Sequence, residues 1–368
     1  MNVYLKESER VEYSSPYGIV APMSATDRSG RTDTLLLRDK FDRVARDLRV
    51  SLTDRCNLRC SYCMPPEGLE WLPDECTLTD DEVVRLCRIG VEILGIRAIR
   101  FTGGEPLLRP GLEAIVQEVS QLRTDEGMVP DISMTTNGLG LAHRAHRLAG
   151  AGMVRVNISL DTIDADHFRQ ITRRDRLPDV LAGIAAAGDA GLSPIKVNAV
   201  LLKGINDEGA GALLEFCLNR GIELRFIEQM PIGPRQAWDR SRLVTRDDIL
   251  ALLGRDHRLT PVERCERSAP ARLWLVDDDP ENRVGIIASV SEPFCADCDR
   301  TRLTSDGQIR SCLFATREFD LRGILRGGGS DVEVARAWAD AMWLKPSAHG
   351  LDEVNFATPS RTMSRIGG

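Results

Sequence analysis

Short apolar runs recur through the middle of the chain, and each is followed by a longer segment whose apolar residues have helical spacing. Helical spacing covers residues 79–94, 110–122, 142–149, the segment up to about residue 188, and 210–219. Alternating strands and helices favour a parallel sheet with right-handed crossovers. The apolar runs predict six strands, LRVSLT (48–53), AIRFT (98–102), DISMTT (131–136), VRVNISL (154–160), PIKVNAVL (194–201) and IELRFIEQM (222–230).

Six β/α units occupy about two hundred residues, fewer than the ~250 of a closed eight-unit barrel. We therefore predict an α/β fold built as an open, partial TIM-type barrel. At the start of the first helix, Thr79 and Glu82 have the spacing of a capping box.

The segments on either side of these units differ in pattern. Residues 1–40 are polar and irregular and predict a flexible N-terminal extension, and residues 41–255 hold the barrel. Residues 256–368 predict a C-terminal region with two β-like stretches, RLWLVDD and RVGIIAS, and a hairpin around Asp306-Gly307. A helix over 332–344 and an irregular tail to Gly368 complete the prediction.

Polar motifs follow the predicted strands at the same end. Cysteines come after the first strand, Gly103-Gly104-Glu105 after the second, and Thr135-Thr136-Asn137 at the end of the third. Ser159-Leu160-Asp161 ends the fourth, while Glu228 and Met230 end the sixth. Barrel enzymes carry their active sites at the carboxyl ends of the strands, so these motifs predict an active site there.

Two cysteine triplets carry the candidate chemistry. They are Cys56, Cys60 and Cys63 after the first strand, and Cys295, Cys298 and Cys312 around the predicted hairpin. A [4Fe–4S] cluster normally takes four thiolates, so three leave one iron open for a small molecule. Two such triplets predict two open clusters. A zinc site needs four Cys or His ligands. It is a rival reading for each triplet, and an auxiliary electron-transfer cluster is a further rival for the second.

Composition narrows the function classes. The chain has 368 residues, a net charge of −7 and ten cysteines, and no apolar run approaches the ~20 residues of a membrane span. Nothing resembles the global basic footprint of a nucleic-acid-binding protein. The cysteine spacings suit metals rather than a disulfide framework. We expect a cytoplasmic protein that binds neither nucleic acid nor membrane. The remaining cysteines, Cys76, Cys87, Cys217 and Cys265, are expected to be inert.

The first triplet carries a resemblance to a known superfamily. The CxxxCxxC spacing with Tyr62 before its last cysteine, followed by Gly103-Gly104-Glu105-Pro106, resembles radical S-adenosylmethionine (SAM) enzymes. The second triplet, Arg300-Thr301-Arg302 and the terminal Gly367-Gly368 narrow the resemblance to the MoaA-type GTP 3′,8-cyclase family, from about Leu48 to the C-terminus. The resemblance implies the same partial barrel. It also implies that Cys56, Cys60 and Cys63 hold a cluster whose open iron takes SAM, with SAM contacts at Tyr62, Gly104, Ser159 and Met230.

The same resemblance implies a second [4Fe–4S] cluster on Cys295, Cys298 and Cys312 that meets the guanine of GTP. It also implies a catalytic role for Gly367 and Gly368. The adenosyl radical from SAM would remove hydrogen from the ribose 3′ carbon, which would then join guanine carbon 8, in the first step of molybdenum cofactor biosynthesis. The implied GTP contacts are Arg49, Arg100, Thr135, Lys196, Arg300, Thr301 and Arg302.

The expected partners are GTP, SAM, a reductant for the first cluster, and cyclic pyranopterin monophosphate synthase as the enzyme that receives the product. A homodimer is compatible with the sequence. Two alternative functions remain open at this point. One is another radical SAM enzyme with an auxiliary cluster, such as a peptide-modifying enzyme, and the other is a non-catalytic iron–sulfur electron carrier.

Overall fold

The fold is given by a computed structural model that describes residues 19–20, 30, 35–233, 238–264, 266–351, 356 and 358–367. Six neighbouring parallel strands form its centre, where the sequence predicts them. They are β2 (Asp47–Ser51), β3 (Ala98–Thr102), β4 (Asp131–Thr136), β5 (Arg155–Ser159), β6 (Ile195–Val200) and β7 (Glu223–Ile227).

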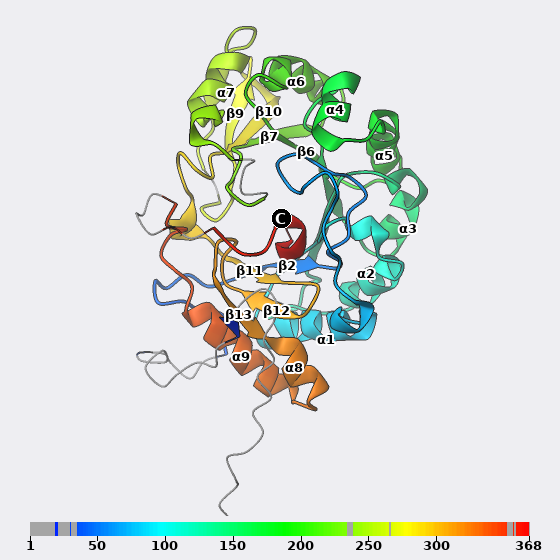
Figure 1. Cartoon of the computed structure of the whole chain (residues 1–368), viewed down its shortest axis with the longest axis vertical. Helices are drawn as coiled ribbons and strands as arrows, with labels where there is room; N and C mark the ends of the chain where they lie inside the picture. Colours follow the sequence, from blue (N-terminus) through cyan, green and yellow to red (C-terminus); the bar gives the residue numbers. More distant parts are fainter. Residues whose placement is uncertain are drawn as a thin grey trace, which may run out of the picture.

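Helices cover the outer face of these strands, so that the sheet curves around an interior (Figure 1). The first helix begins at the predicted capping box of Thr79 and Glu82 and continues into a π-helical turn, Ile89–Ile93. The helices between the central strands are α1 (Asp80–Arg88), α2 (Leu112–Ser120), α3 (Ala145–Gly150), α4 (Ala165–Thr172), α5 (Leu177–Asp189) and α6 (Ala210–Leu218).

Residues after 255, together with the short strand β1 (Ile19–Val20), extend this sheet at both of its edges. At one edge β10 (Asp279–Ile287) pairs in parallel with β7 and continues into β9 (Arg272–Val276) and β8 (Leu259–Pro261). At the other edge β11 (Arg300–Leu303) pairs in parallel with β2 and continues into β12 (Gln308–Arg310), β13 (Arg317–Asp320) and β1 (Ile19–Val20). In the described parts of the chain β1 and β8 end the strand order. The barrel is therefore open, as predicted.

In the described part of the chain after β7, four further α-helices follow. They are α7 (Arg246–Leu253), α8 (Leu321–Arg326), α9 (Asp331–Trp343) and α10 (Met363–Ile366). The hairpin of β11 and β12 and the helix that ends near residue 344 confirm the prediction. The expectation of an irregular tail is wrong at α10, where Ile366 is fully buried. Much of the predicted N-terminal extension lies outside the described residues. However, Leu37 is fully buried, so residues 35–40 belong to the folded body.

Side-chain alternation along the strands separates the core from the interior of the barrel. In β3, Ile99 and Phe101 are fully buried beneath the helices, while Arg100 between them points the other way and lines a cavity. Cys87 and Cys217 are also fully buried, as expected for inert core residues, whereas Cys265 lies outside the described residues. Strand periodicity thus separates the apolar outer face of the sheet from the polar face that lines the interior.

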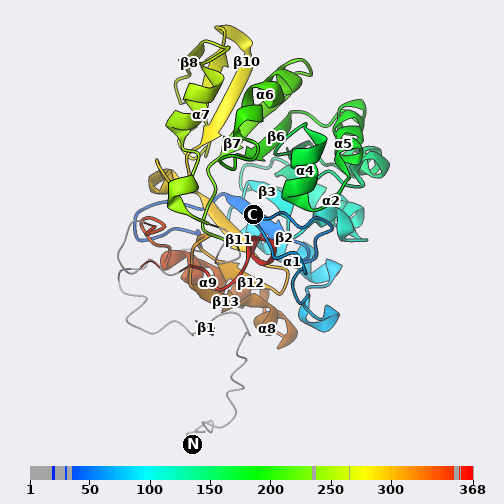
Figure 2. The same cartoon turned by 45° about the horizontal axis from the view of Figure 1, so that its top comes forward.

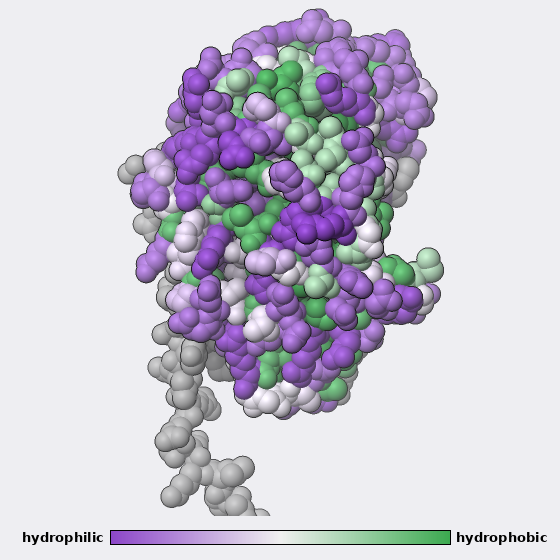
Figure 3. All heavy atoms as spheres, turned by 90° about the vertical axis from the view of Figure 1, so that its right-hand side faces the viewer, coloured by the Kyte–Doolittle hydropathy of each residue, from purple (hydrophilic) through white to green (hydrophobic). Residues whose placement is uncertain are grey.

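On the face shown in Figure 3, hydrophilic side chains cover most of the surface, with smaller apolar areas between them. No helix in the described ranges is long and apolar enough to cross a membrane.

Candidate functional site

One cavity at the carboxyl ends of the central strands gathers most of the predicted site residues. Its lining includes all three cysteines of the first triplet, and an adjoining cavity is lined by all three of the second. Both cavities share Met230, Arg300 and Arg302. The other predicted residues that line the first cavity are Tyr62, Gly104, Ser159, Thr135, Arg49 and Arg100.

The first cysteine loop leaves the end of β2 and is anchored by buried Leu58. A backbone hydrogen bond of 2.9 Å from the amide of Cys63 to the carbonyl of Cys60 closes its turn. Burial raises the pKa of the Cys56 thiol to about 11 and that of Cys63 to about 12. A bound metal reverses this preference, because a coordinating thiol loses its proton. The loop therefore offers partly buried thiols that a bound metal would convert to thiolates.

The donor sets of both triplets fit iron–sulfur clusters. Three thiols and an open position suit a cluster with one free iron, because thiolates are the ligands that such clusters take. Among the described residues, no three His, Cys, Asp or Glu side chains converge as they would around a single metal ion.

The Gly-Gly-Glu-Pro loop packs tightly on the cysteine loop. The Gly104 amide donates to the carbonyl of Thr53 at 2.7 Å, and a β-carbon on Gly104 would collide with the backbone of Asp54 and Arg55. The carboxylate of Glu105 accepts hydrogen bonds from the Thr136 hydroxyl and the Asn137 amide at 2.6 and 2.7 Å. Burial raises its pKa to about 7. The loop therefore locks the end of β3 to the end of β4, beside the first triplet.

Tyr62 is held in place from the far side of the cavity. Its hydroxyl donates to the carboxylate of Asp161 at 2.8 Å, and Asp161 also accepts from the amide of Val200 at 2.9 Å. Ser159 and Met230 line the same cavity. The side chains predicted to contact SAM thus come from the ends of β5 and β7 and from the cysteine loop.

The hairpin of β11 and β12 brings Cys312 to Cys295 and Cys298, as predicted. Buried Lys345 lies beside them, with its ammonium 3.4 Å from the sulfur of Cys298. The same ammonium donates to the carbonyls of Cys298 and Arg300 at 2.8 Å each. Burial alone would raise the pKa of the Cys298 thiol, but the charges of Lys345 and Arg300 outweigh it and lower that pKa. Lys345 thus favours the thiolate of Cys298.

Three arginines form a row across adjacent strands. Arg302 of β11 is in register with Arg49 of β2, which is in register with Arg100 of β3. Burial, and then repulsion from Arg49 and Arg300, lower the pKa of Arg302 to about 9. Asp47 is the carboxylate beside them and accepts two hydrogen bonds of 3.1 Å from Arg49. We call Arg49, Arg100 and Arg302 the arginine row.

Two of the predicted GTP contacts, Thr301 and Lys196, do not line either of these cavities. The Thr301 side chain is fully buried and accepts a hydrogen bond of 3.0 Å from the indole of Trp338 in α9. Alternation along β11 turns this side chain away from Arg300 and Arg302, and the expected GTP contact at Thr301 stays a prediction. Lys196 pairs with Glu223 at 3.3 Å and is not among the cavity residues. Gly367 contacts the site, whereas Gly368 lies outside the described residues.

The sequence reading missed several residues that line the cavity. Arg225 of β7 and Asn198 of β6 are two of them, and Lys345 beside the second triplet is another missed residue. Alternation in Glu223-Leu-Arg-Phe-Ile offered a signal for Arg225, since two charged residues share one face of an otherwise apolar strand.

Comparison with known proteins agrees with this geometry. Residues 50–217 match the family model of the radical SAM superfamily, and residues 222–351 match that of Molybdenum Cofactor Synthesis C. A GTP 3′,8-cyclase of Corynebacterium glutamicum is 58% identical over 337 residues, which cover 90% of this chain and 89% of that protein. A GTP 3′,8-cyclase of Mycobacterium marinum is 56% identical over 335 residues, covering 90% and 92%.

A solved structure shares the fold. The crystal structure of Streptococcus suis SuiB bound to S-adenosylmethionine superposes with a TM-score of 0.53 at 15% identity, covering 75% of this chain and 62% of that one. This likeness extends to the fold alone. The two family models and the relatives that are 56–58% identical over 90% of the chain show that the chain belongs to the GTP 3′,8-cyclase family of radical SAM enzymes.

Proposed function

We propose that this chain converts GTP into 3′,8-cyclo-7,8-dihydro-GTP while SAM is cleaved to methionine and 5′-deoxyadenosine, with a [4Fe–4S] cluster on each cysteine triplet. The reductant would supply two electrons, one to cleave SAM and one that, with a proton, completes the cyclised nucleotide after the ribose radical has joined guanine carbon 8. One observation carries the proposal. Two sets of three cysteines line adjoining cavities that share Met230, Arg300 and Arg302, with the arginine row along the wall. A protein that only transfers electrons has no use for a row of buried cations beside an open thiolate set.

Each cysteine triplet would hold its cluster and leave one iron open. When bound, the first cluster supplies the electron that cleaves SAM to a 5′-deoxyadenosyl radical, and the second supplies an open iron for the guanine. The protein around the clusters would position SAM and GTP and exclude water. Tyr62, fixed by Asp161, and the backbone of Gly104 would confine SAM beside the first triplet.

The arginine row and Arg300 would bind the triphosphate. Guanidinium groups bind phosphate oxygens through paired hydrogen bonds and keep their charge at neutral pH. The row has more positive charge than Asp47 can balance, so an anion with several charges fits it. We add Arg225 to the residues predicted to face GTP, because it lines the same cavity.

Apolar side chains close the region between the two triplets. Ile232, Phe314 and Ile366 form a separate buried cluster against which Met230 and Cys312 pack. Excluding water protects a reactive radical from side reactions. The reductant, the transfer of product to cyclic pyranopterin monophosphate synthase, a homodimer and a cytoplasmic location remain predictions.

Anaerobic reconstitution followed by iron counting, SAM cleavage and mass analysis of the nucleotide tests the proposal. We expect about eight irons per chain for two four-iron clusters. We also expect 5′-deoxyadenosine and a cyclised nucleotide that keeps its triphosphate. Cleavage of SAM that neither consumes nor responds to GTP would indicate another radical SAM enzyme. A protein that holds clusters but does not cleave SAM would be an electron carrier.

A further inference from the structure

The C-terminal tail, residues 358–367, ends inside the site. Met363 and Ser364 line the cavity of the first triplet, and Ile366 is fully buried against Ile232 and Phe314. Figure 2 shows the short helix α10 at the centre of the molecule, near β2 and β11. The tail is therefore a wall of the site.

The tail lies directly against residues of the site. Ser364 lines the same cavity as Cys63, and the carbonyl of Gly367 accepts a hydrogen bond from Arg302. Gly367 has φ = 83°, and a β-carbon there would lie 3.0 Å from the Thr102 side chain. The last described turn of the tail thus lies beside the first triplet and contacts the arginine row, in a conformation that favours glycine.

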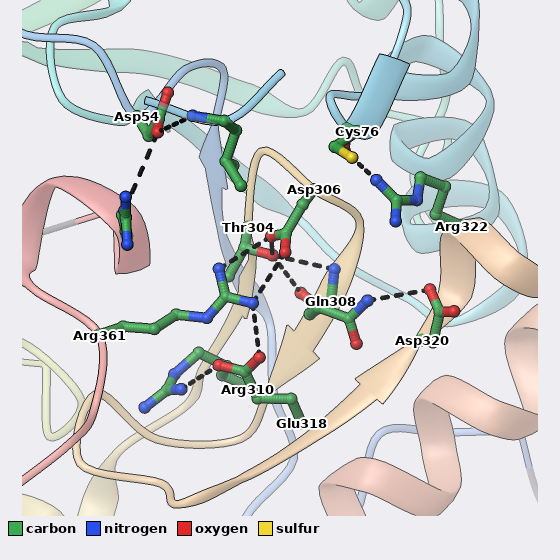
Figure 4. A network of polar contacts seen from close by, with 12 residues as sticks. Asp54, Cys76, Thr304, Asp306, Gln308, Arg310, Glu318, Asp320, Arg322 and Arg361 are labelled. Carbon is green, nitrogen blue, oxygen red and sulfur yellow. Dashed lines mark hydrogen bonds and ion pairs between the residues drawn. The ribbon is translucent and has the colours of Figure 1, made fainter. Parts of the chain in front are cut away.

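A buried ion network holds the tail in this position (Figure 4). Arg361, about 1% exposed, donates to Asp306 at 2.8 and 3.0 Å and to Glu318 at 2.6 Å. Asp306 stands in the turn of the β11–β12 hairpin and Glu318 in β13. One guanidinium therefore ties the tail to two carboxylates of the C-terminal strands.

The same network reaches the loop that carries Cys312. Glu318 also pairs with Arg310, and both of these side chains are about 1% exposed. Arg310 in turn donates to the carbonyls of Leu313 and Ala315. The charges of two arginines and two carboxylates balance. Because a buried charge without its partner is costly, tail and loop are held in one arrangement.

We propose that Arg361 is a positioning residue that seats the tail against the cysteine loop and the arginine row, and links that seat to the Cys312 loop. The expected effect of Arg361 on turnover rests on the proposed function. Its effect on the position of the tail does not. Arg361 touches neither triplet. It acts through the backbone of residues 364–367 and through Glu318 and Arg310.

Hydrogen exchange on the reconstituted full-length protein without GTP tests the seating. In Arg361→Gln, amides of residues 364–367 should exchange roughly ten- to hundred-fold faster, the factor expected for lost charge-assisted hydrogen bonds. Amides of α2 and α5 should be unchanged. Arg361→Lys keeps one cation and should restore part of the protection. The matched control is Arg336→Gln on the exposed face of α9, which should exchange like wild type.

Steady-state turnover of GTP is an independent measurement of the role of Arg361. Arg361→Gln should lower kcat and the product formed per SAM cleaved, with the KM for GTP unchanged, because the arginine row is intact. If Arg361→Gln does not fold, Glu318→Gln keeps the Arg361–Asp306 pair and should give a smaller effect in the same amides. Wild-type exchange in the tail of every variant that removes a network charge would overturn the proposal. A changed tail in a protein that never turns over GTP would instead refute the proposed function.

Discussion

Replacing Arg100 by Met should weaken GTP binding without a matching loss of stability. Arg100 lies between Arg49 and Ser133 in the register of the sheet and donates one hydrogen bond of 3.2 Å, to the Ser133 hydroxyl. Burial, and then repulsion from Arg49, lower its pKa well below the usual value, although Asp47 opposes this. A guanidinium keeps its proton at neutral pH, so crowding raises the free energy of the row when no anion is bound.

The sizes of the opposing effects decide whether Arg100→Met is more or less stable than wild type. Replacing a buried ion pair or triad by apolar side chains of similar volume is often neutral or stabilising by about 1–4 kcal/mol, and we expect the same for one guanidinium of a crowded row. Loss of the hydrogen bond to Ser133 costs about 1 kcal/mol. The free energy of unfolding should therefore change by between about −1 and about +3 kcal/mol. Losing a charge-assisted contact to phosphate costs about 1.5–3 kcal/mol, so GTP affinity should fall roughly ten- to hundred-fold.

Chemical denaturation without nucleotide and anaerobic calorimetric titration of GTP measure the two quantities. The control Ser133→Ala removes the hydrogen-bond acceptor and keeps the charge, so it should lose a little stability and little affinity. Arg100→Met that is less stable than wild type by more than about 2 kcal/mol would refute the crowding argument. Wild-type GTP affinity in that variant would remove Arg100 from the binding site.

Other predictions follow from separate features. Replacing any cysteine of the first triplet by Ala should abolish SAM cleavage, whereas changes in the second should spare the first cluster's absorbance and stop GTP turnover; iron counts and product analysis check both. Lys345→Gln should lower the reduction potential of the second cluster, since a cation leaves its Cys298 ligand; redox titration followed by electron paramagnetic resonance measures it, and an unchanged potential would contradict the contact. Burial opposes ionisation of Asp306, but Arg361 outweighs it and holds the pKa low. Its ionised form therefore stabilises the fold above about pH 4 and that stability is lost as the pH falls through the lowered pKa. Asp306→Asn should be less stable at pH 7 and show a smaller loss between about pH 5 and 3; an identical acid profile would count against the network.

Local patterns were enough to predict the strands and the end of the sheet that carries the site. Alternation in residues 98–102 and 131–136 is a local property, and so is the spacing of Cys56, Cys60 and Cys63. The hairpin could be predicted because Asp306-Gly307 is a turn signal between two apolar runs.

Side-chain direction and long-range pairing were harder to predict. Thr301 sits between two arginines in the sequence, yet it packs under Trp338 because β11 joins the sheet beside β2. Lys345 and Arg361 are single charges in segments without a period, and their partners are 47 and 55 residues away. Nothing local distinguishes such residues from solvated surface charges. Their roles depend on contacts that exist only in the folded chain.

Transfer of hydrogen from the ribose tests the central claim most directly. The reconstituted protein, supplied with SAM, a reductant and GTP deuterated at the ribose 3′ carbon, should yield 5′-deoxyadenosine that carries deuterium, together with a cyclised nucleotide lacking it. Mass spectrometry reads both molecules in one reaction. Deuterium-free 5′-deoxyadenosine, formed while GTP is consumed, would contradict the account.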